Sequence, residues 1–229
     1  MLLAGTTVFA MAQKVVNDAN AEKRNVAGFT AIKISSSIDL YLSQGSEEAV
    51  AVSASETKYR DRIKTEVKDG TLSIWFDSEG WSWTNGNKKM RAYVSFKTLK
   101  MLKASGACDV IVDGVIKATD LDVSLSGASD FKGALDAGTV KVVIVGASDM
   151  TVKGSVGNLS VDASGASDFK GYELVTQNCN AEASGASDIK VTVDKEISAS
   201  ATGASDIRYK GNAVIKKTHN SGASSVKKV

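Results

Sequence analysis

Aspartate side chains recur at a regular interval in the second half of the 229-residue chain and are the first candidates for chemistry. Each closes a five-residue motif, Ser-Gly-Ala-Ser-Asp or a close variant of it. If these carboxylates stack, their oxygens and the neighbouring serine hydroxyls could hold Ca²⁺ or another hard cation. The motif lacks the Gly-Gly-x-Gly-x-Asp spacing of a calcium-binding β-roll, which counts against a metal. The candidate metal ligands are Asp130, Asp149, Asp168, Asp188 and Asp206, and Asp109 begins the series.

A second interpretation of the same aspartates needs no ligand. Basic residues follow two positions later, on the same strand face, at Lys132, Lys170, Lys190 and Arg208. Like charges stacked about 4.8 Å apart would repel one another, and a neighbouring column of opposite charge removes that repulsion. We therefore predict a solvated lattice of Asp with Lys or Arg, or Asp capping backbone donors at a corner, and no cofactor. Calcium remains the alternative.

Two tryptophans are the best candidates for a ligand-binding surface. Trp81 and Trp83 fall in a polar, glycine-containing segment at 77–87, a composition typical of a loop. Indole rings on such a loop can stack on a sugar face or anchor a protein partner. The alternative is that they fold back and shield the side or the end of the domain. A third tryptophan, Trp75, lies in a strand predicted at 71–76, and we expect it in the core.

The rest of the composition excludes several classes of function. The single histidine, His219, lies near the C-terminus, so histidine catalysis has one badly placed candidate. Cys108 and Cys179 cannot form a zinc site by themselves or a dense disulfide framework. Lys and Arg number 28 against 26 Asp and Glu, and a net charge of +2 is too small for a protein that neutralises nucleic-acid phosphates. We assign no catalytic residues and no nucleic-acid partner.

An internal repeat indicates the scaffold that positions these residues. Its glycines are spaced by 21, 19, 19, 20, 18 and 19 residues. A period near 20 is typical of a solenoid in which one repeat is one coil. Glycine would let successive backbones approach closely at a tight corner. The glycines are Gly106, Gly127, Gly146, Gly165, Gly185, Gly203 and Gly222.

Between the glycines, apolar and polar residues alternate. Leu121, Val123 and Leu125 alternate with Asp122 and Ser124 in one repeat, which predicts a half-buried strand. No helical segment could cover the apolar face, so each strand must stack on its copy in the next coil. We predict an all-β fold, a right-handed parallel β-helix with about 19–20 residues per coil. A left-handed helix of hexapeptide repeats is the alternative, but the drifting spacing does not show its strict period.

The repeat also suggests how the chain is divided. Residues 25–104 are rich in alternating segments but lack the motif, although Ser35-Ser36-Ser37-Ile38-Asp39 looks like a degenerate copy. We predict a single β-helix domain over 25–229, with irregular, more sheet-like coils at 25–104 and motif-bearing coils at 105–229.

The N-terminus resembles an export signal. Residues 1–12 are mostly apolar or small, and Ala10-Met11-Ala12 fits a signal-peptide cleavage site. A packed or disordered N-terminal strand is the alternative, and 13–24 would be a flexible segment. No stretch is long and apolar enough for a transmembrane helix. We expect an exported protein, located in the periplasm, at the outer surface or outside the cell.

The cysteines provide a geometric expectation. Cys108 and Cys179 are 71 residues apart, which is about 3.7 coils and places them about 17 Å apart along the axis at about 4.8 Å per coil. A disulfide needs its Cα atoms within about 7 Å, so we predict two free, mostly buried thiols.

We also expect basic residues to protect the open last coil from edge-to-edge association. These residues are Lys216, Lys217, Lys227 and Lys228.

The order of motifs resembles one bacterial family. The chain reads Asn25-Val26-Ala27-Gly28-Phe29-Thr30-Ala31-Ile32, then Ser37-Ile38-Asp39-Leu40-Tyr41-Leu42-Ser43-Gln44-Gly45, then Gly70-Thr71-Leu72-Ser73-Ile74, then the repeats. This order is similar to that of the family called "putative auto-transporter adhesin, head GIN domain". The resemblance implies an exported β-helix and brings no catalytic residues. At the position aligned with Gly-Ile-Asn this chain has Ser37-Ile38-Asp39.

Together these observations predict a secreted or cell-surface binding or structural module, an adhesin that recognises a glycan or a protein. The alternative is a β-helical polysaccharide-active enzyme of the lyase or glycosidase kind. Such an enzyme would group acidic and basic residues at one cleft, whereas here they recur on every coil.

Overall fold

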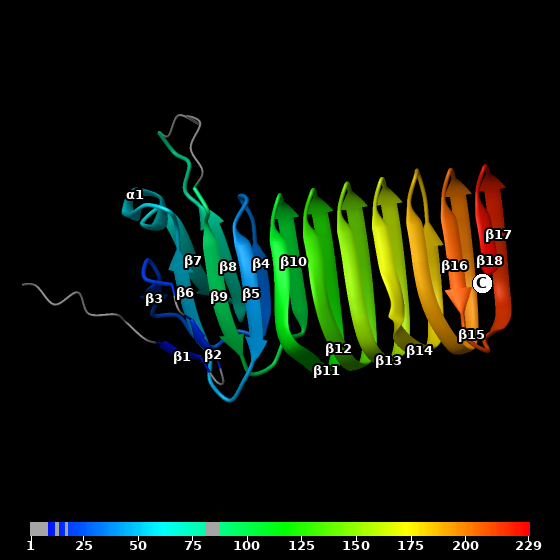
Figure 1. Cartoon of the computed structure of the whole chain (residues 1–229), viewed down its shortest axis with the longest axis horizontal. Helices are drawn as coiled ribbons and strands as arrows, with labels where there is room; N and C mark the ends of the chain where they lie inside the picture. Colours follow the sequence, from blue (N-terminus) through cyan, green and yellow to red (C-terminus); the bar gives the residue numbers. More distant parts are fainter. Residues whose placement is uncertain (1–8, 12–13, 17, 81–87) are drawn as a thin grey trace, which may run out of the picture.

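The computed structural model describes residues 9–11, 14–16, 18–80 and 88–229. The described chain is nearly all strand with one short helix, and it forms a β-solenoid of about 7 turns (Figure 1). The predicted all-β solenoid is confirmed. Within the described residues, no helix has the length and apolar character needed to cross a membrane.

The motif-bearing half of the chain forms the regular coils. A coil is one long curved strand that starts at a motif aspartate and ends at or near the next motif glycine. Neighbouring coils pair in parallel, with Gly127 opposite Gly146 and Gly146 opposite Gly165. The strands are β10 (Met101–Gly106), β11 (Asp109–Gly127), β12 (Asp130–Gly146), β13 (Asp149–Gly165), β14 (Asp168–Ala183), β15 (Asp188–Gly203), β16 (Asp206–Lys210), β17 (Val214–Gly222) and β18 (Ser225–Lys228).

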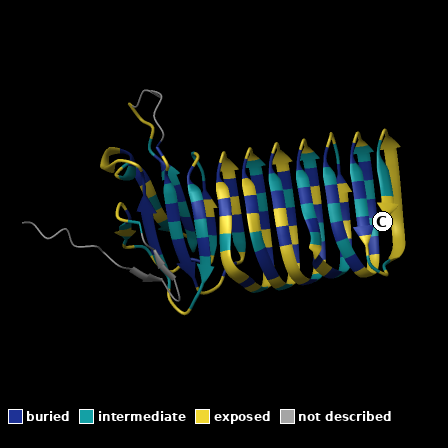
Figure 2. Ribbon diagram, in the orientation of Figure 1, coloured by how far each residue is buried: buried dark blue, intermediate teal, exposed yellow. Residues whose placement is uncertain are grey.

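Alternation along each strand sorts side chains into the core and the outer face. In β11, Leu121 and Val123 are buried while Asp122 between them is exposed. The register places these two apolar residues opposite Val140 and Val142 of β12. Because the match repeats from coil to coil, apolar side chains form continuous columns inside the solenoid. Figure 2 shows buried and exposed positions alternating along the strands.

The motif glycine forms a corner that only glycine fits. Gly146 has a φ of +96°, and a Cβ atom there would lie 2.5 Å from the carbonyl oxygen of Gly127. The same approach, within 2.7 Å, recurs at the later motif glycines. The cause is a close hydrogen bond between coils, in which Ala147 N donates to Gly127 O at 2.8 Å.

The second serine of the motif points inward. Ser129 N donates to Ser148 Oγ at 3.0 Å, and Ser129 Oγ donates to Ser126 O at 3.1 Å. Cys108 holds this position in the first regular coil, with its Sγ 3.3 Å from Ser105 O. Each hydroxyl is therefore satisfied inside the solenoid, as buried polar groups must be. The buried serines are Ser129, Ser148, Ser167, Ser187 and Ser205.

The N-terminal part is more sheet-like, as predicted. Parallel pairing continues through β4 (Ala31–Ile34), β5 (Asp39–Gln44), β8 (Thr71–Phe76) and β9 (Arg91–Phe96). Ile34 pairs with Ala104 and Leu40 with Val110, so the segment between them stacks on the first full motif.

Antiparallel strands close this end of the solenoid. β3 (Glu22–Arg24) pairs with β6 (Ala49–Ser53), β6 pairs with β9, and β7 (Ile63–Lys68) pairs with β8. Helix α1 (Thr57–Arg60) lies between β6 and β7 in the chain, and β1 (Phe9–Met11) pairs with β2 (Lys14–Val16). We call β3, β6, β7 and α1 the cap. Its antiparallel strands cover the edges of β8 and β9 that would otherwise be open to association.

Two local expectations differ from the structure. Glu22–Arg24 form β3 of the cap, so ordered structure extends into the segment expected to be flexible. Trp75 is half-buried on the outer side of β8, because strand parity gives the inward positions to Leu72, Ile74 and Phe76.

Both cysteines are free and buried, as predicted. Burial raises the pKa of Cys179 to about 12, so its thiolate is scarce at neutral pH.

At the C-terminal end of the solenoid, every residue of β17 is exposed. Lys216 Nζ on this strand lies 3.0 Å from Glu196 Oε1.

Candidate functional site

The motif aspartates form a column along the outer face. Asp109 lies opposite Asp130 and Asp168 lies opposite Asp188 in the strand register. Asp149 N donates to Asp130 Oδ1 at 3.2 Å, so an aspartate also accepts a backbone donor of the next coil. The column consists of Asp39, Asp109, Asp130, Asp149, Asp168, Asp188 and Asp206.

Both ends of the column show the electrostatic effect of stacking. Burial, followed by the charge of Asp109, raises the pKa of Asp39. At the other end, Ser225 Oγ donates to Asp206 Oδ1 at 2.6 Å, and this bond is the main cause that lowers the pKa of Asp206. A hydroxyl or a cation next to an aspartate therefore relieves the repulsion that a second aspartate creates.

Two basic residues bridge successive aspartates. Lys170 Nζ lies 2.6 Å from Asp149 Oδ2 and 3.3 Å from Asp168 Oδ2. Arg208 bridges the next two aspartates of the column at 3.5 and 2.5 Å. The hydrogen bond that Lys170 donates to Asp149 is the main cause that raises the pKa of Lys170. This is an ion-pair lattice over the last four aspartates of the column.

Lys190 lies between these two bridging residues. It pairs in register with Lys170 on one side and with Arg208 on the other. The four nearest aspartates of the column are already contacted by those neighbours. In the described part of the chain, no carboxylate lies within 4.0 Å of Lys190 Nζ. Lys190 therefore has no ion-pair partner among the described side chains.

The candidate metal ligands do not gather around one point. Over residues 18–80 and 88–229, no three His, Cys, Asp or Glu side chains are grouped so that they could hold a metal ion. The aspartates are spread one to a coil, with Lys170 and Arg208 between four of them. Binding of Ca²⁺ to the column stays a prediction for a metal titration.

Unequal coil lengths produce a groove on the neighbouring part of the outer face. From Ile111 to Val115, β11 advances by four residues while the paired segment of β12 advances by two, so β11 bulges. From Gly171 to Val175, β14 advances by four residues while the paired segment of β15 advances by one, so β14 also bulges. β12 and β13 pair without any shift. The evenly paired strands β12 and β13 thus lie between the bulged strands β11 and β14. A groove of about 680 Å³ runs over this part of the surface.

The lining of the groove is partly apolar and partly basic. Ile111 and Val115 line it with exposed fractions of 38% and 43%, which are high for aliphatic side chains. Tyr172, in the bulge of β14, adds an aromatic ring. Four lysines and one acidic residue, Glu173, also line it. The lysines are Lys132, Lys153, Lys170 and Lys190.

Sequence reasoning missed this groove. The available signal was the spacing between motif glycines, because the two coils that bulge are those of 21 and 20 residues. Spacing alone does not say where in a coil the extra residues go. The tryptophans that the sequence does single out, Trp81 and Trp83, lie outside the described residues.

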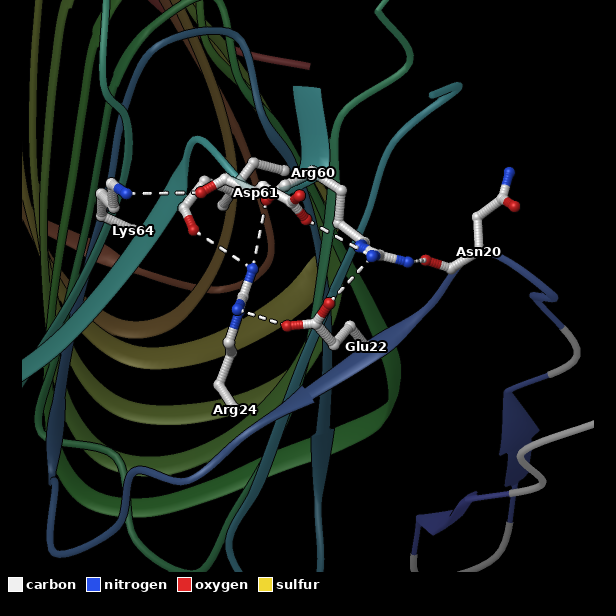
Figure 3. Close-up of polar contacts among 7 residues, drawn as sticks. Asn20, Glu22, Arg24, Arg60, Asp61 and Lys64 are labelled. Atoms are coloured by element: carbon white, nitrogen blue, oxygen red, sulfur yellow. Dashed lines mark hydrogen bonds and ion pairs between the residues drawn. The ribbon is translucent and has the colours of Figure 1, made fainter. Parts of the chain in front are cut away.

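Ion pairs and hydrogen bonds connect a polar cluster on the cap, in which Arg24 Nε and Arg60 Nε have no hydrogen-bond partner among the described residues (Figure 3). Arg24 Nη1 lies 2.6 Å from Glu22 Oε1, and Arg24 Nη2 donates to the carbonyl oxygen of Arg60 at 3.1 Å. Arg60 Nη2 lies 3.0 Å from Glu22 Oε2 and 3.3 Å from Asp61 Oδ1. The partners all belong to the cap, so the cluster holds β3 against α1.

A second polar group connects the chain before β3 to β9. Tyr93 Oη donates to Asp18 Oδ2 at 2.9 Å, and Arg91 Nη1 lies 3.7 Å from the same oxygen. Burial and then the bond to Asp18 raise the pKa of Tyr93 to about 12. Burial acts to raise the pKa of Asp18, but hydrogen bonds from Ser53, the Asn20 amide and Tyr93 outweigh it and lower that pKa.

Comparisons with known proteins agree with this architecture. Three solved structures share the fold, each less than 25% identical to this chain. A "putative adhesin" from Bacteroides fragilis is 21% identical, with a TM-score of 0.83 over 91% of this chain and 96% of its own. A "putative adhesin" from Parabacteroides merdae is 19% identical, with a TM-score of 0.70 over 91% and 95%. A "putative lipid binding protein" from Parabacteroides distasonis is 20% identical, with a TM-score of 0.69 over 92% and 97%.

A search of curated proteins gave no match. The family model described as "Putative auto-transporter adhesin, head GIN domain" matches residues 28–213. The matched region contains strands β4 to β16 and helix α1, and β1 to β3 lie before it. The chain therefore belongs to the family described as "Putative auto-transporter adhesin, head GIN domain".

Proposed function

We propose that this chain is an exported adhesion module that binds a glycan or a protein at a cell surface through the outer face of its solenoid. The family and two of the three structural relatives are named as putative adhesins, which supports the general class, and the third is named as a putative lipid binding protein. The observation that carries the proposal is the register of the coils, because it repeats the same polar side chains at a fixed interval. Solenoids use such extended surfaces for binding.

A repeated surface suits a repeated partner. Coils about 4.8 Å apart present a series of weak contacts, and a polymer that engages several of them gains affinity from each additional contact. A polysaccharide or an extended polypeptide fits this description better than a single small molecule.

Binding of the full chain to a glycan array and to a panel of surface proteins tests the proposal. We expect selective binding to one chemical class. The absence of binding to every glycan and every protein would contradict it.

The tryptophan loop is a separate part of the proposal. If Trp81 and Trp83 contact the partner, Trp81→Ala and Trp83→Ala weaken binding, whereas Val145→Ala does not. Val145 is a matched control because it is an exposed apolar residue, 44% accessible, on β12. Unchanged binding in both tryptophan variants would remove the loop from the binding surface.

The same protein sample tests the enzymatic alternative. A turnover screen on bacterial and host polysaccharides is expected to show no cleavage, because acidic and basic residues are spread over the coils instead of meeting at one point. Cleavage that a single aspartate substitution abolishes would favour the enzyme.

A further inference from the structure

We propose that the groove over β11–β15 binds a carboxylate-bearing glycan and is the recognition site of the adhesion module. This inference rests on the proposed function and specifies its ligand class and its location. The groove is defined by its lining residues, which come from five consecutive coils between Ile111 and Lys190. Five coils at about 4.8 Å span about 19 Å, which suits an extended oligomer better than a single ring.

The size and openness of the groove favour a hydrophilic chain. Its volume of about 680 Å³ lies within the range of ligand sites, roughly 300–1,000 Å³. Ile111, Val115 and Lys153 on its lining are exposed, so a bound molecule keeps one side in water. A sugar tolerates that exposure, whereas an acyl chain gains most of its binding energy from being enclosed.

The apolar part of the lining suits sugar rings. The ring of Tyr172 and the side chains of Ile111 and Val115 offer flat or branched apolar surface against which the C–H face of a sugar can pack. The Tyr172 segment is held in place, because Thr192 Oγ1 donates to Tyr172 O at 2.8 Å. Lys210 Nζ lies 4.5 Å from the centroid of the Tyr172 ring.

The charge of the lining selects an acidic sugar. Four lysines line the groove against one acidic side chain, Glu173, which lies opposite Lys153 in the register. Lys170 already bridges two aspartates, but Lys190 has no carboxylate partner among the described residues. A ligand carboxylate beside Lys190 would form a charge-assisted hydrogen bond with its ammonium group.

Calorimetric titration of the full chain with tetragalacturonic acid tests this assignment. We expect binding that weakens as NaCl is raised, and no binding of the neutral galactotetraose. Lys190→Gln should weaken binding roughly tenfold, because it removes one charge-assisted hydrogen bond. Tyr172→Ala should weaken it about fivefold through loss of the aromatic contact. Lys195→Gln, which changes an exposed lysine of β15 outside the groove, should leave affinity unchanged.

Lys190→Gln replaces a partly exposed charge with a polar side chain of similar length on an outward position of β15, so it remains informative if Tyr172→Ala alters the bulge. Equal affinity of Lys190→Gln and the unaltered chain would overturn the groove as the site. Equal binding of galactotetraose, or tighter binding of tetraglutamate or of phosphatidylglycerol vesicles, would overturn the ligand class.

One further outcome separates this inference from the function on which it rests. A chain that binds another glycan or a protein but not tetragalacturonic acid refutes the groove assignment and leaves the adhesion module standing. A chain that binds no partner at all refutes both.

Discussion

Replacing one motif glycine by alanine should destabilise the solenoid through a backbone clash between coils. Gly146 has a φ of +96°, and its added Cβ would lie 2.5 Å from Gly127 O. The left-handed backbone costs an alanine about 1–2 kcal/mol. Separating the two coils to relieve the clash adds about 1–3 kcal/mol, as in overpacked cores. The free energy of unfolding of Gly146→Ala should therefore fall by about 2–5 kcal/mol, a large share of a typical total of about 5–15 kcal/mol.

Gly114→Ala is the matched control. Gly114 also has a positive φ, +86°, but nothing lies within 4 Å of its added Cβ. It should lose only the backbone part, about 1–2 kcal/mol. Urea unfolding followed by circular dichroism gives both values, and hydrogen exchange shows whether the loss is confined to the coils next to Gly146, as expected for a solenoid. Equal destabilisation of the two variants would refute the clash.

Three further predictions concern the buried serines, a tyrosine and a cysteine. Ser148→Ala leaves the amide of Ser129 without its acceptor and should lower the free energy of unfolding, measured in urea, by about 1–3 kcal/mol. Ser148→Cys should cost less, because Cys108 fills the equivalent position in the first regular coil. Equal losses in the two variants would contradict a role for the serine hydrogen bonds between coils. The folded state holds the Tyr93 proton more tightly than the unfolded state, with a pKa raised from 10.0 to about 12. The contribution of Tyr93 to stability is therefore full below pH 10 and is lost between pH 10 and about 12. Tyr93→Phe should reduce the fall of the urea unfolding midpoint over this pH range. The same fall of the midpoint in the variant and the unaltered chain would contradict this. Cys179, with its pKa raised to about 12 by burial, should react with a thiol reagent only after unfolding, and rapid reaction of the native protein would contradict its burial.

The regular coils could be predicted because two independent signals agree in them. Period-two alternation fixes which side chains face inward, and the motif glycines fix where each coil restarts. Trp75 shows the limit of an alternating pattern as a guide. Its place in a predicted strand suggested the core, but parity along β8 places it outside and half-buried.

The cap and the groove could not be predicted for physical reasons. An alternating strand looks the same whether it pairs in parallel or antiparallel, so nothing in β6 or β7 revealed their antiparallel partners. The groove depends on where extra residues bulge out, and that is decided by pairing with the next coil. Tyr172 gained its place on the groove from such a bulge.

Every column and the groove depend on the in-register stacking of successive coils, and distances between spin labels measure that stacking directly. The test uses a background with Cys108→Ser and Cys179→Ala. Labels at Asp109→Cys and Asp188→Cys are four coil steps apart and should give about 19 Å, and labels at Asp109→Cys and Asp206→Cys should give about 24 Å. Distances that do not lengthen by about one coil spacing between the two pairs would contradict the stacked solenoid.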